Sequence, residues 1–253
     1  MTQQERREYL IRELLKERGE EGALPAQEEA QKGLLRALFN VRPPREASAA
    51  FLEVQDAYLR EEIRRRGVTE AAALSPVKGR LCLWQGDITT LACDAIVNAA
   101  NSAMLGCFHP NHGCIDNAIH TFSGVQLRLF CARMMRGGAL GTGEAVMTPA
   151  FNLPSRFIAH TVGPIVRGAL RPEDRELLAR CYESCLSLAA ENGVETLAFC
   201  CISTGEFGFP PQEGAKVAVE TVSRALSSFP SIKKVIFNVF RTQDLEIYRR
   251  VLA

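Results

Sequence analysis

The chain has 253 residues, of which 47% are hydrophobic and 23% charged, enough for one large domain with an appendage. Its formal net charge of +1 gives no overall field that would attract nucleic acid or a membrane surface. No apolar run approaches the roughly 20 residues of a spanning helix, and the N-terminus lacks the apolar core of a signal peptide. Nine cysteines, an odd number, fit reduced thiols better than a disulfide scaffold. We therefore expect a cytoplasmic protein.

Residues 1–75 are unusually rich in charge, since they hold nearly half of all charged side chains. Apolar residues recur at helical spacing over 9–15, 34–39 and 51–63, and the third stretch ends at Gly67. This pattern predicts a helical N-terminal extension that packs on the main domain. The arginines before Gly67 alternate with glutamates, which favours a solvated helix face. We expect no chemistry from this segment.

Residues 76–253 alternate short apolar runs with amphipathic stretches, which predicts a largely parallel sheet covered by helices on both faces. The predicted strands are Arg80–Trp84, Ala95–Asn98, Arg156–Thr161, Thr196–Cys200 and Lys234–Val239. The predicted helices are Cys114–Phe122, Val125–Met135, Glu173–Asn192, Gln212–Phe229 and Asp244–Leu252. Ligands bind such sheets at the carboxyl ends of the strands, so the loops there are the candidate site.

Two of these loops carry polar side chains after a strand. In Gly86–Thr89, the Asp87 carboxylate can accept a hydrogen bond from an exocyclic amine such as that of adenine. Asp87 or Thr89 can equally be the N-cap of a short helical turn. In Asn98–Asn101, two amides flank two alanines, so the backbone can approach a ligand while an amide orients hydroxyls. An ordinary Asn-rich turn is the alternative.

Residues 106–114, GCFHPNHGC, are the most specific local signal. Zinc prefers thiolate and imidazole ligands in tetrahedral geometry, and Cys107, His112 and Cys114 supply three of them. A fourth position left open is typical of catalytic zinc, whereas closure by His109 would indicate a structural site. The spacing matches no common zinc finger, so an unliganded loop remains the alternative.

The loop Ser203–Pro210 lies between a predicted strand and a predicted helix. Its glycines and hydroxyl residues suit a backbone nest for a pyrophosphate. The sequence matches neither of the common Gly-rich nucleotide fingerprints. Of the remaining candidates, four cysteines and two histidines are expected in the core: Cys181, Cys185, Cys200, Cys201, His120 and His160.

Taken together, the motifs resemble those of the macrodomain family in their order along the chain. They are GDIT at 86–89, NAAN at 98–101, IHTFSG at 119–124, GTGEAVMTPAFNL at 141–153, IAHTVGP at 158–164 and STGEFGFP at 203–210. The resemblance covers about residues 79–252. It implies a three-layer α/β macrodomain over 76–253, with a mixed, largely parallel central sheet, after a helical extension over 1–75.

The sequence departs from common macrodomain hydrolases where residues 106–114 replace a glycine run. It there resembles the zinc-containing macrodomains of bacteria and fungi, which implies one Zn²⁺ per chain. Members of that subgroup are protein-ADP-ribose hydrolases associated with sirtuin-type ADP-ribosyltransferases and lipoyl-carrier proteins. They remove mono-ADP-ribose from an acidic side chain, so the resemblance implies those partners for this chain.

Carried over by position, the resemblance implies specific roles for the site residues. Asp87 and Ile88 would hold adenine, and Phe240 would stack on it. The backbone of Ser203, Thr204, Gly205, Glu206 and Phe207 would wrap the pyrophosphate. Asn101, Cys114, Ile115 and Asp116 would flank the distal ribose. Cys107, His112 and Cys114 would hold the metal beside that ribose, with Asn101 and Asp116 as the catalytic residues.

Two mechanisms remain open from sequence: zinc can activate a water, or it can coordinate a ribose hydroxyl and polarise the ester. The open ligand position favours direct contact with substrate, with Asp116 as general base or water-orienting residue. Two rival functions also remain. One is a reader of ADP-ribose with a structural zinc, and the other is a deacetylase of O-acetyl-ADP-ribose.

Overall fold

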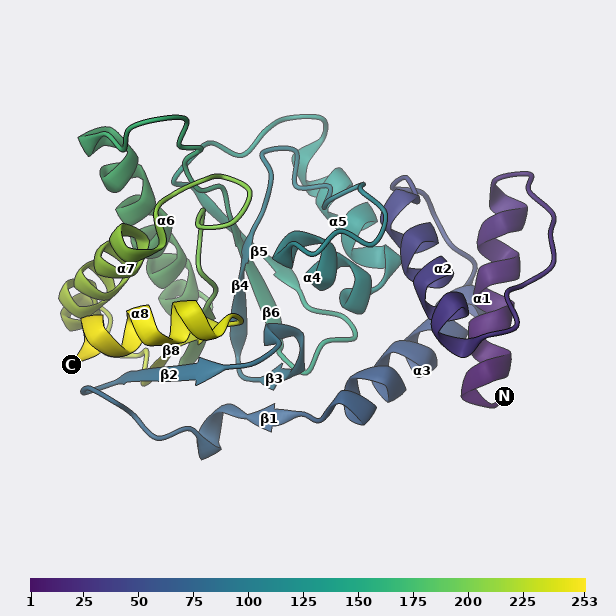
Figure 1. The fold of residues 1–253 in the computed structure, drawn as a ribbon, viewed down its shortest axis with the longest axis horizontal. Coiled ribbons are helices and arrows are strands. Elements are labelled where there is room, and N and C mark those ends of the chain that lie inside the picture. The colour runs from purple at the N-terminus through teal and green to yellow at the C-terminus, as the bar shows by residue number, and fades with distance from the viewer.

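The computed structural model describes residues 1–253 as an α/β domain with three helices at one end (Figure 1). The strands are β1 (Thr69–Glu70), β2 (Leu81–Gln85), β3 (Leu91–Ala92), β4 (Ala95–Ala99), β5 (Ala145–Pro149), β6 (Phe157–Thr161), β7 (Thr196–Phe199) and β8 (Lys234–Val239). The helices are α1 (Gln3–Glu17), α2 (Glu28–Val41), α3 (Ala49–Arg66), α4 (Ile115–Ser123), α5 (Val125–Met135), α6 (Pro172–Glu191), α7 (Pro211–Ala225) and α8 (Thr242–Leu252). Short 3-10 turns are η1 (Ala71–Ala73), η2 (Ile88–Thr90) and η3 (Leu226–Ser228).

The central sheet has six strands in the order β2-β8-β7-β4-β6-β5. All neighbours pair in parallel except β5 and β6, so the sheet is mixed and largely parallel, as expected. Helices α6, α7 and α8 cover one face, and α4 and α5 lie on the other (Figure 1). The three-layer fold with a helical N-terminal region is confirmed. A two-stranded sheet of β1 and β3 was not foreseen, because strands of two residues leave no periodic signal.

The expected elements differ from the observed ones mainly at their ends, where caps set the boundary. For α4, Cys114 is the N-cap with an extended backbone, so the helix begins at Ile115 rather than Cys114. For α3, the Ser48 side chain accepts from the Phe51 N–H, and Gly67 ends the helix at φ 84°. None of the helices combines the length and apolar character required to cross a membrane.

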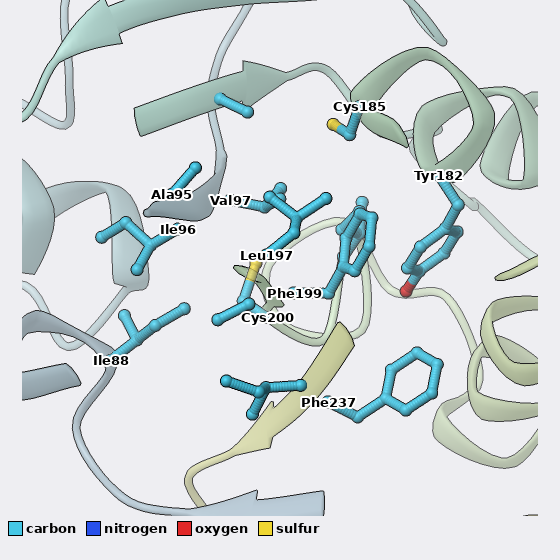
Figure 2. Packing of buried hydrophobic residues seen from close by; sticks show 14 of the residues in the cluster. Ile88, Ala95, Ile96, Val97, Tyr182, Cys185, Leu197, Phe199, Cys200 and Phe237 are labelled. Atoms are coloured by element: carbon cyan, nitrogen blue, oxygen red, sulfur yellow. The ribbon is translucent and has the colours of Figure 1, made fainter. Parts of the chain in front are cut away.

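Two hydrophobic clusters hold the chain together. The larger lies between the sheet and its covering helices, and Figure 2 shows strand residues such as Val97 and Leu197 facing Cys185 of α6. There the Tyr182 and Phe199 rings pack with centroids 4.9 Å apart. Cys181 and Cys185 are fully buried, as expected. The smaller cluster joins α1, α2 and α3 to Val125 of α5.

The proposed domain boundary at residue 75 stays a prediction. The small cluster contains apolar residues from all three N-terminal helices, which gives this region a core of its own. Ile63 of α3 and Ala71, however, pack in the large cluster. The N-terminal helices are therefore docked firmly on the sheet domain rather than tethered to it.

Candidate functional site

A cleft of about 880 Å³ opens at the carboxyl ends of the adjacent strands β2, β8, β7 and β4. It lies where a largely parallel sheet is expected to bind its ligand. Each residue to which sequence assigned a binding, metal or catalytic role lines this cleft: Asp87, Ile88, Asn101, Cys107, His112, Cys114, Ile115, Asp116, Ser203, Thr204, Gly205, Glu206, Phe207 and Phe240. The fold thus gathers them around one cavity, while their individual roles stay predictions.

One end of the cleft is formed by Asp87 after β2 and Phe240 after β8. Asp87 is the N-cap of η2, since its Oδ1 accepts from the Thr89 N–H at 2.9 Å and the Thr89 hydroxyl at 2.6 Å. The cap uses Oδ1 alone, while Oδ2 accepts from Arg66, so a ligand amine would share Oδ2 with that arginine. The Phe240 side chain is 74% exposed. An exposed aromatic ring at the rim is suited to stacking on a base.

Arg66, at the end of α3, is a cleft residue that sequence reasoning missed. Its Nη1 donates to Asp87 Oδ2 at 2.6 Å, and its guanidinium lies 3.6 Å from the centroid of the Phe122 ring. Burial lowers the pKa of Arg66, while the neighbouring Asp87 opposes that shift. Arg66 is exposed as a residue, as expected for this helix face, but the close approach of α3 to η2 brings its guanidinium to the rim of the cleft.

The loop after β7 presents backbone donors to the middle of the cleft. The N–H groups of Gly205, Glu206 and Phe207 make no hydrogen bond within the protein. Ser203 takes a left-handed backbone at φ 64°, the kind of conformation that turns successive N–H groups toward one point. A Cβ on Gly163 would lie 2.0 Å from the Ser203 Oγ, so glycine is required there to admit this loop. The free N–H groups make this loop a candidate anion cradle.

The other end of the cleft holds three metal-ligand side chains. The candidate ligand atoms of Cys107, His112 and Cys114 all lie within 4.8 Å of one another, and Cys107 Sγ is 3.5 Å from His112 Nδ1. Zn–S bonds of about 2.3 Å and Zn–N bonds of about 2.0 Å place a sulfur and a nitrogen about 3.5 Å apart at the tetrahedral angle. These residues can therefore hold a metal ion, and their chemistry fits zinc.

The neighbours of this cluster show which side chains could provide a fourth metal ligand. His109 is not part of the group, and its exposed ring meets that of His112 edge-on with centroids 5.4 Å apart. On the far side of His112, Nε2 lies 3.5 Å from a carboxylate oxygen of Glu206. A carboxylate on the outer nitrogen of a ligating imidazole is the usual way that such a ring is oriented. Burial raises the pKa of the Cys114 thiol above its ordinary value.

Asp116 lies beside the cluster in the first turn of α4, buried against β4. Its oxygens accept from Asn98 Nδ2 at 2.8 Å and Asn101 Nδ2 at 3.2 Å. Burial raises the pKa of Asp116 to about 6, although hydrogen bonds from both amides and the charge of Arg128 oppose the shift. Two neutral donors thus fix this carboxylate at the cleft wall.

Asn101 can offer a ligand fewer hydrogen-bonding groups than the sequence alone indicates. Its Nδ2 is used within the protein, since it donates to Gly106 O at 3.0 Å as well as to Asp116. The Oδ1 atom is left as the group that can accept from a hydroxyl of a ligand. Asn98, which carried no assigned role, positions Asp116 from the strand. Its place in the NAAN motif is the only signal in the sequence.

Arg36 of α2 is the second cleft residue that the sequence did not reveal. Its Nη2 donates to His112 O at 3.1 Å and to Asn117 Oδ1 at 2.9 Å. Helix α2 therefore reaches the metal-binding end of the cleft, so residues 1–75 contribute Arg36 and Arg66 to its lining, while the expectation that they carry no chemistry stays a prediction. The sequence separation between these partners hides the contact.

The chain is thus an α/β domain whose cleft has Asp87 and Phe240 at one end, a thiol-imidazole cluster at the other and the candidate anion cradle between them. The Macro domain family profile matches residues 97–218. A protein of Treponema medium named protein-ADP-ribose hydrolase is 53% identical over 261 residues, covering 100% of both chains. One of the same name from Staphylococcus aureus strain MSSA476 is 48% identical over 250 residues, 96% of this chain and 94% of that one. The chain belongs to the macrodomain family.

Solved structures agree with this assignment. The Trypanosoma brucei macrodomain in complex with ADP-ribose superposes with a TM-score of 0.67 at 28% identity, over 86% of this chain and 95% of that one. The Oceanobacillus iheyensis macrodomain with ADP superposes with a TM-score of 0.63 at 36% identity, over 71% of this chain and 93% of that one. Both share the fold whose cleft is described above.

Proposed function

We propose that this protein is a zinc-dependent hydrolase that removes mono-ADP-ribose from an acidic side chain of a modified protein. The observation that carries the proposal is the position of the metal-ligand cluster, which shares one end of the cleft with Asp116 and Asn101. The relatives named protein-ADP-ribose hydrolase match over nearly their whole length, which supports the same activity for this chain.

In the proposed complex each part of ADP-ribose has its own place in the cleft. Asp87 and Ile88 receive adenine at one end, where Phe240 stacks on the base. The free N–H groups of Gly205 to Phe207 bind the pyrophosphate. The distal ribose then lies between Asn101, whose Oδ1 accepts from a hydroxyl, and the wall formed by Cys114, Ile115 and Asp116.

Hydrolysis breaks the bond between the distal ribose and the carboxylate of the target protein. Water supplies a hydroxyl to one fragment and a proton to the other. Asp116, held by two amide donors, is placed to orient this water and take its proton. When bound, zinc supplies Lewis-acid polarisation of substrate or water. Cys107, His112 and Cys114 would hold it, and a group of three ligands supports an open fourth position.

The resemblance to sirtuin-linked zinc macrodomains supports a more specific substrate. We include in the proposal a lipoyl-carrier protein as the target and a sirtuin-type ADP-ribosyltransferase as the functional partner. The anion cradle and the adenine end bind the ADP-ribosyl group, so the carrier protein itself lies outside the cleft, beyond the metal-binding end.

The test uses the full chain and two substrates. Metal analysis of the purified protein is expected to give one zinc per chain. Incubation with a protein mono-ADP-ribosylated on an acidic side chain should release ADP-ribose, whereas O-acetyl-ADP-ribose should be hydrolysed more slowly. Cys107→Ala and His112→Ala should abolish release but retain ADP-ribose binding by calorimetry. The control is Cys93→Ser, because the Cys93 thiol makes a hydrogen bond only to a nearby backbone carbonyl.

Each rival function gives a different result. A reader would bind ADP-ribose and the modified protein without releasing product, with or without zinc. A small-ester deacetylase would prefer O-acetyl-ADP-ribose. Full activity of the demetallated protein on the modified carrier would refute the catalytic role of zinc.

A further inference from the structure

The loop of residues 106–114, which carries the metal ligands, is tied to helix α2 by side-chain hydrogen bonds. Arg36 of α2 donates through Nη2 to the carbonyl oxygen of His112, one of the ligands, at 3.1 Å. The same guanidinium donates two hydrogen bonds to Asn117 Oδ1, from Nη2 at 2.9 Å and from Nε at 3.2 Å. A planar guanidinium with several fixed donors suits such a contact, and a lysine cannot reproduce it.

Asn117, which Arg36 holds in place, makes two further hydrogen bonds to the loop. It is fully buried in α4, and its Nδ2 donates to His109 O at 3.0 Å. Its backbone N–H donates to Cys114 Sγ at 3.4 Å. Arg36 and Asn117 therefore fix the loop at His109, His112 and Cys114, which include two of the three ligands.

A second contact from α2 holds the tip of the loop. Asn40 Oδ1 accepts from the Asn111 N–H at 2.9 Å, and Asn40 Nδ2 donates to Thr121 Oγ1 at 2.9 Å. Asn111 has a left-handed backbone at φ 54°, which costs a non-glycine residue about 1 kcal/mol unless its surroundings hold it. The buried Asn40 amide supplies that support.

The base of the loop is joined to α2 by Arg128 of α5. Its Nε donates to Leu105 O at 2.6 Å, and its Nη1 donates to Phe39 O at 3.0 Å and to Arg42 O. The guanidinium also lies 4.2 Å from the centroid of the Phe108 ring. Contacts with α2 thus reach the loop at its base, its tip and a ligand.

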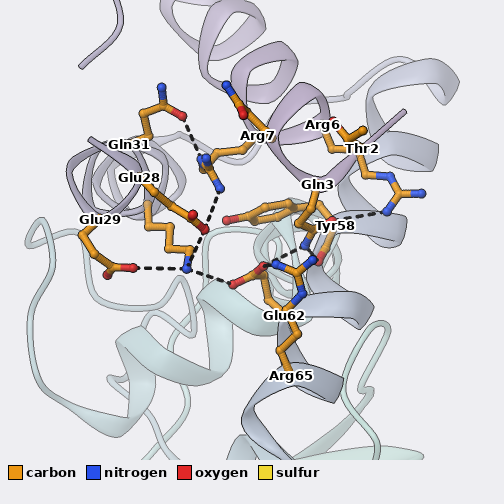
Figure 3. Close-up of polar contacts among 12 residues, drawn as sticks. Thr2, Gln3, Arg6, Arg7, Glu28, Glu29, Gln31, Tyr58, Glu62 and Arg65 are labelled. Atoms are coloured by element: carbon orange, nitrogen blue, oxygen red, sulfur yellow. Dashed lines mark hydrogen bonds and ion pairs between the residues drawn. The ribbon is translucent and has the colours of Figure 1, made fainter. Parts of the chain in front are cut away.

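Helix α2 is itself held rigidly within the N-terminal region. Buried leucines of α1 and α2 share one cluster with Phe51 and Leu59 of α3. Figure 3 shows polar contacts that join the three helices, among them Arg7 Nε to Gln31 Oε1 at 2.9 Å and Gln3 Nε2 to Glu62 Oε1 at 2.8 Å. A rigid α2 can act as a template for the loop.

From these contacts we propose that the N-terminal helices preorganise the metal site, with Arg36 as the positioning residue that sets the geometry of His112. The inference rests on the proposed zinc-dependent function. A loop already ordered before the ion arrives loses less conformational freedom on binding, so its affinity for metal is higher. Helices α1 to α3 are then a working part of the site.

The test compares full-length Arg36→Met with wild type and with Arg64→Met. Arg64 is also on the N-terminal helices, but its side chain is 69% exposed and pairs only with Glu61. Zinc affinity is measured on the demetallated proteins by competition with a chromophoric chelator. Because outer contacts of metal ligands contribute about ten- to a hundredfold in metal affinity, Arg36→Met should weaken zinc by that factor and Arg64→Met should not.

Hydrogen exchange of the metal-free proteins gives a readout independent of zinc. Amides of residues 109 and 111–114 should exchange faster in Arg36→Met, while those of the central strands should stay unchanged, which would also show that the variant is folded. In Arg36→Lys, the exchange rates of these loop amides should lie between those of wild type and those of Arg36→Met. Unchanged zinc affinity and unchanged loop exchange in Arg36→Met would overturn the proposal. If wild type binds no zinc, the proposed function fails, while faster loop exchange still upholds the role of Arg36 in ordering this loop.

Discussion

Burial holds His160 on β6 neutral, and this group by itself predicts a loss of stability in mild acid. Its Nδ1 faces Asn98 Nδ2 at 3.1 Å, and Asn98 also donates to Asp116, so the amide is a donor and Nδ1 must accept. Its Nε2 then carries the proton and faces Thr148 Oγ1 at 2.9 Å. A second ring proton would point at the Asn98 amide.

The size of the effect follows from proton linkage. Complete burial lowers the pKa of His160 from 6.5 to about 3. Between those values the unfolded chain binds a proton at His160 that the folded chain does not. The contribution of His160 to the free energy of unfolding is therefore complete above about pH 6.5 and is lost as the pH decreases toward 3. From pH 7 to pH 5 the loss from this one group is about 2 kcal/mol. Burial also lowers the pKa of the neighbouring His120, which acts in the same direction.

The assay is urea unfolding of the metal-free protein from pH 7 to pH 5, so that acid release of metal contributes nothing. His160→Gln should show a fall smaller by about 2 kcal/mol over this range, whatever its absolute stability. With only four histidines in the chain, imidazole nitrogen NMR can assign each ring and should find His160 protonated at Nε2 at pH 5. A ring that titrates near 6.5, or an equal fall in both proteins, would refute the reasoning.

Three further predictions concern the rim of the cleft, the metal site and the N-terminal core. Phe240→Ala should weaken ADP-ribose by about tenfold through lost stacking and leave the melting temperature unchanged, since the ring is exposed; calorimetry that finds equal affinity contradicts the assignment. Glu206→Gln should weaken zinc binding by only about two- to fivefold, because its carboxylate is 71% exposed; a chelator competition that finds no change would mean that this carboxylate does not support His112. Leu35→Ala should lower the free energy of unfolding by about 2–5 kcal/mol, and a smaller loss in urea would mean that the N-terminal cluster is loosely packed.

Local chemistry made much of the site predictable from sequence. The alternation of apolar runs and amphipathic stretches indicated the strands β2, β4, β6, β7 and β8, because burial on both faces requires continuous apolar residues. Ligands of a metal loop lie within a few residues of one another, so Cys107, His112 and Cys114 could be recognised by spacing. The structure does bring their side chains together.

Helix ends were less accurate, because side-chain caps set them. The sequence could not show that the Cys114 backbone is extended and that its sulfur accepts from Asn117 at the start of α4. Nor could it show that β1 and β3 pair, since two residues carry no period. Such details depend on neighbours that only the folded chain provides.

By itself, the sequence determined the fold class and the loops that line the cleft, since both depend on residues close together in the chain. Only the tertiary structure decided which distant side chains join them. Arg36 and Arg66 look like ordinary charged residues of exposed helices, and they reach the cleft because α2 docks on α4 and α3 approaches η2. Long-range docking leaves no local periodicity, so the part that the N-terminal helices play at the cleft became visible only in three dimensions.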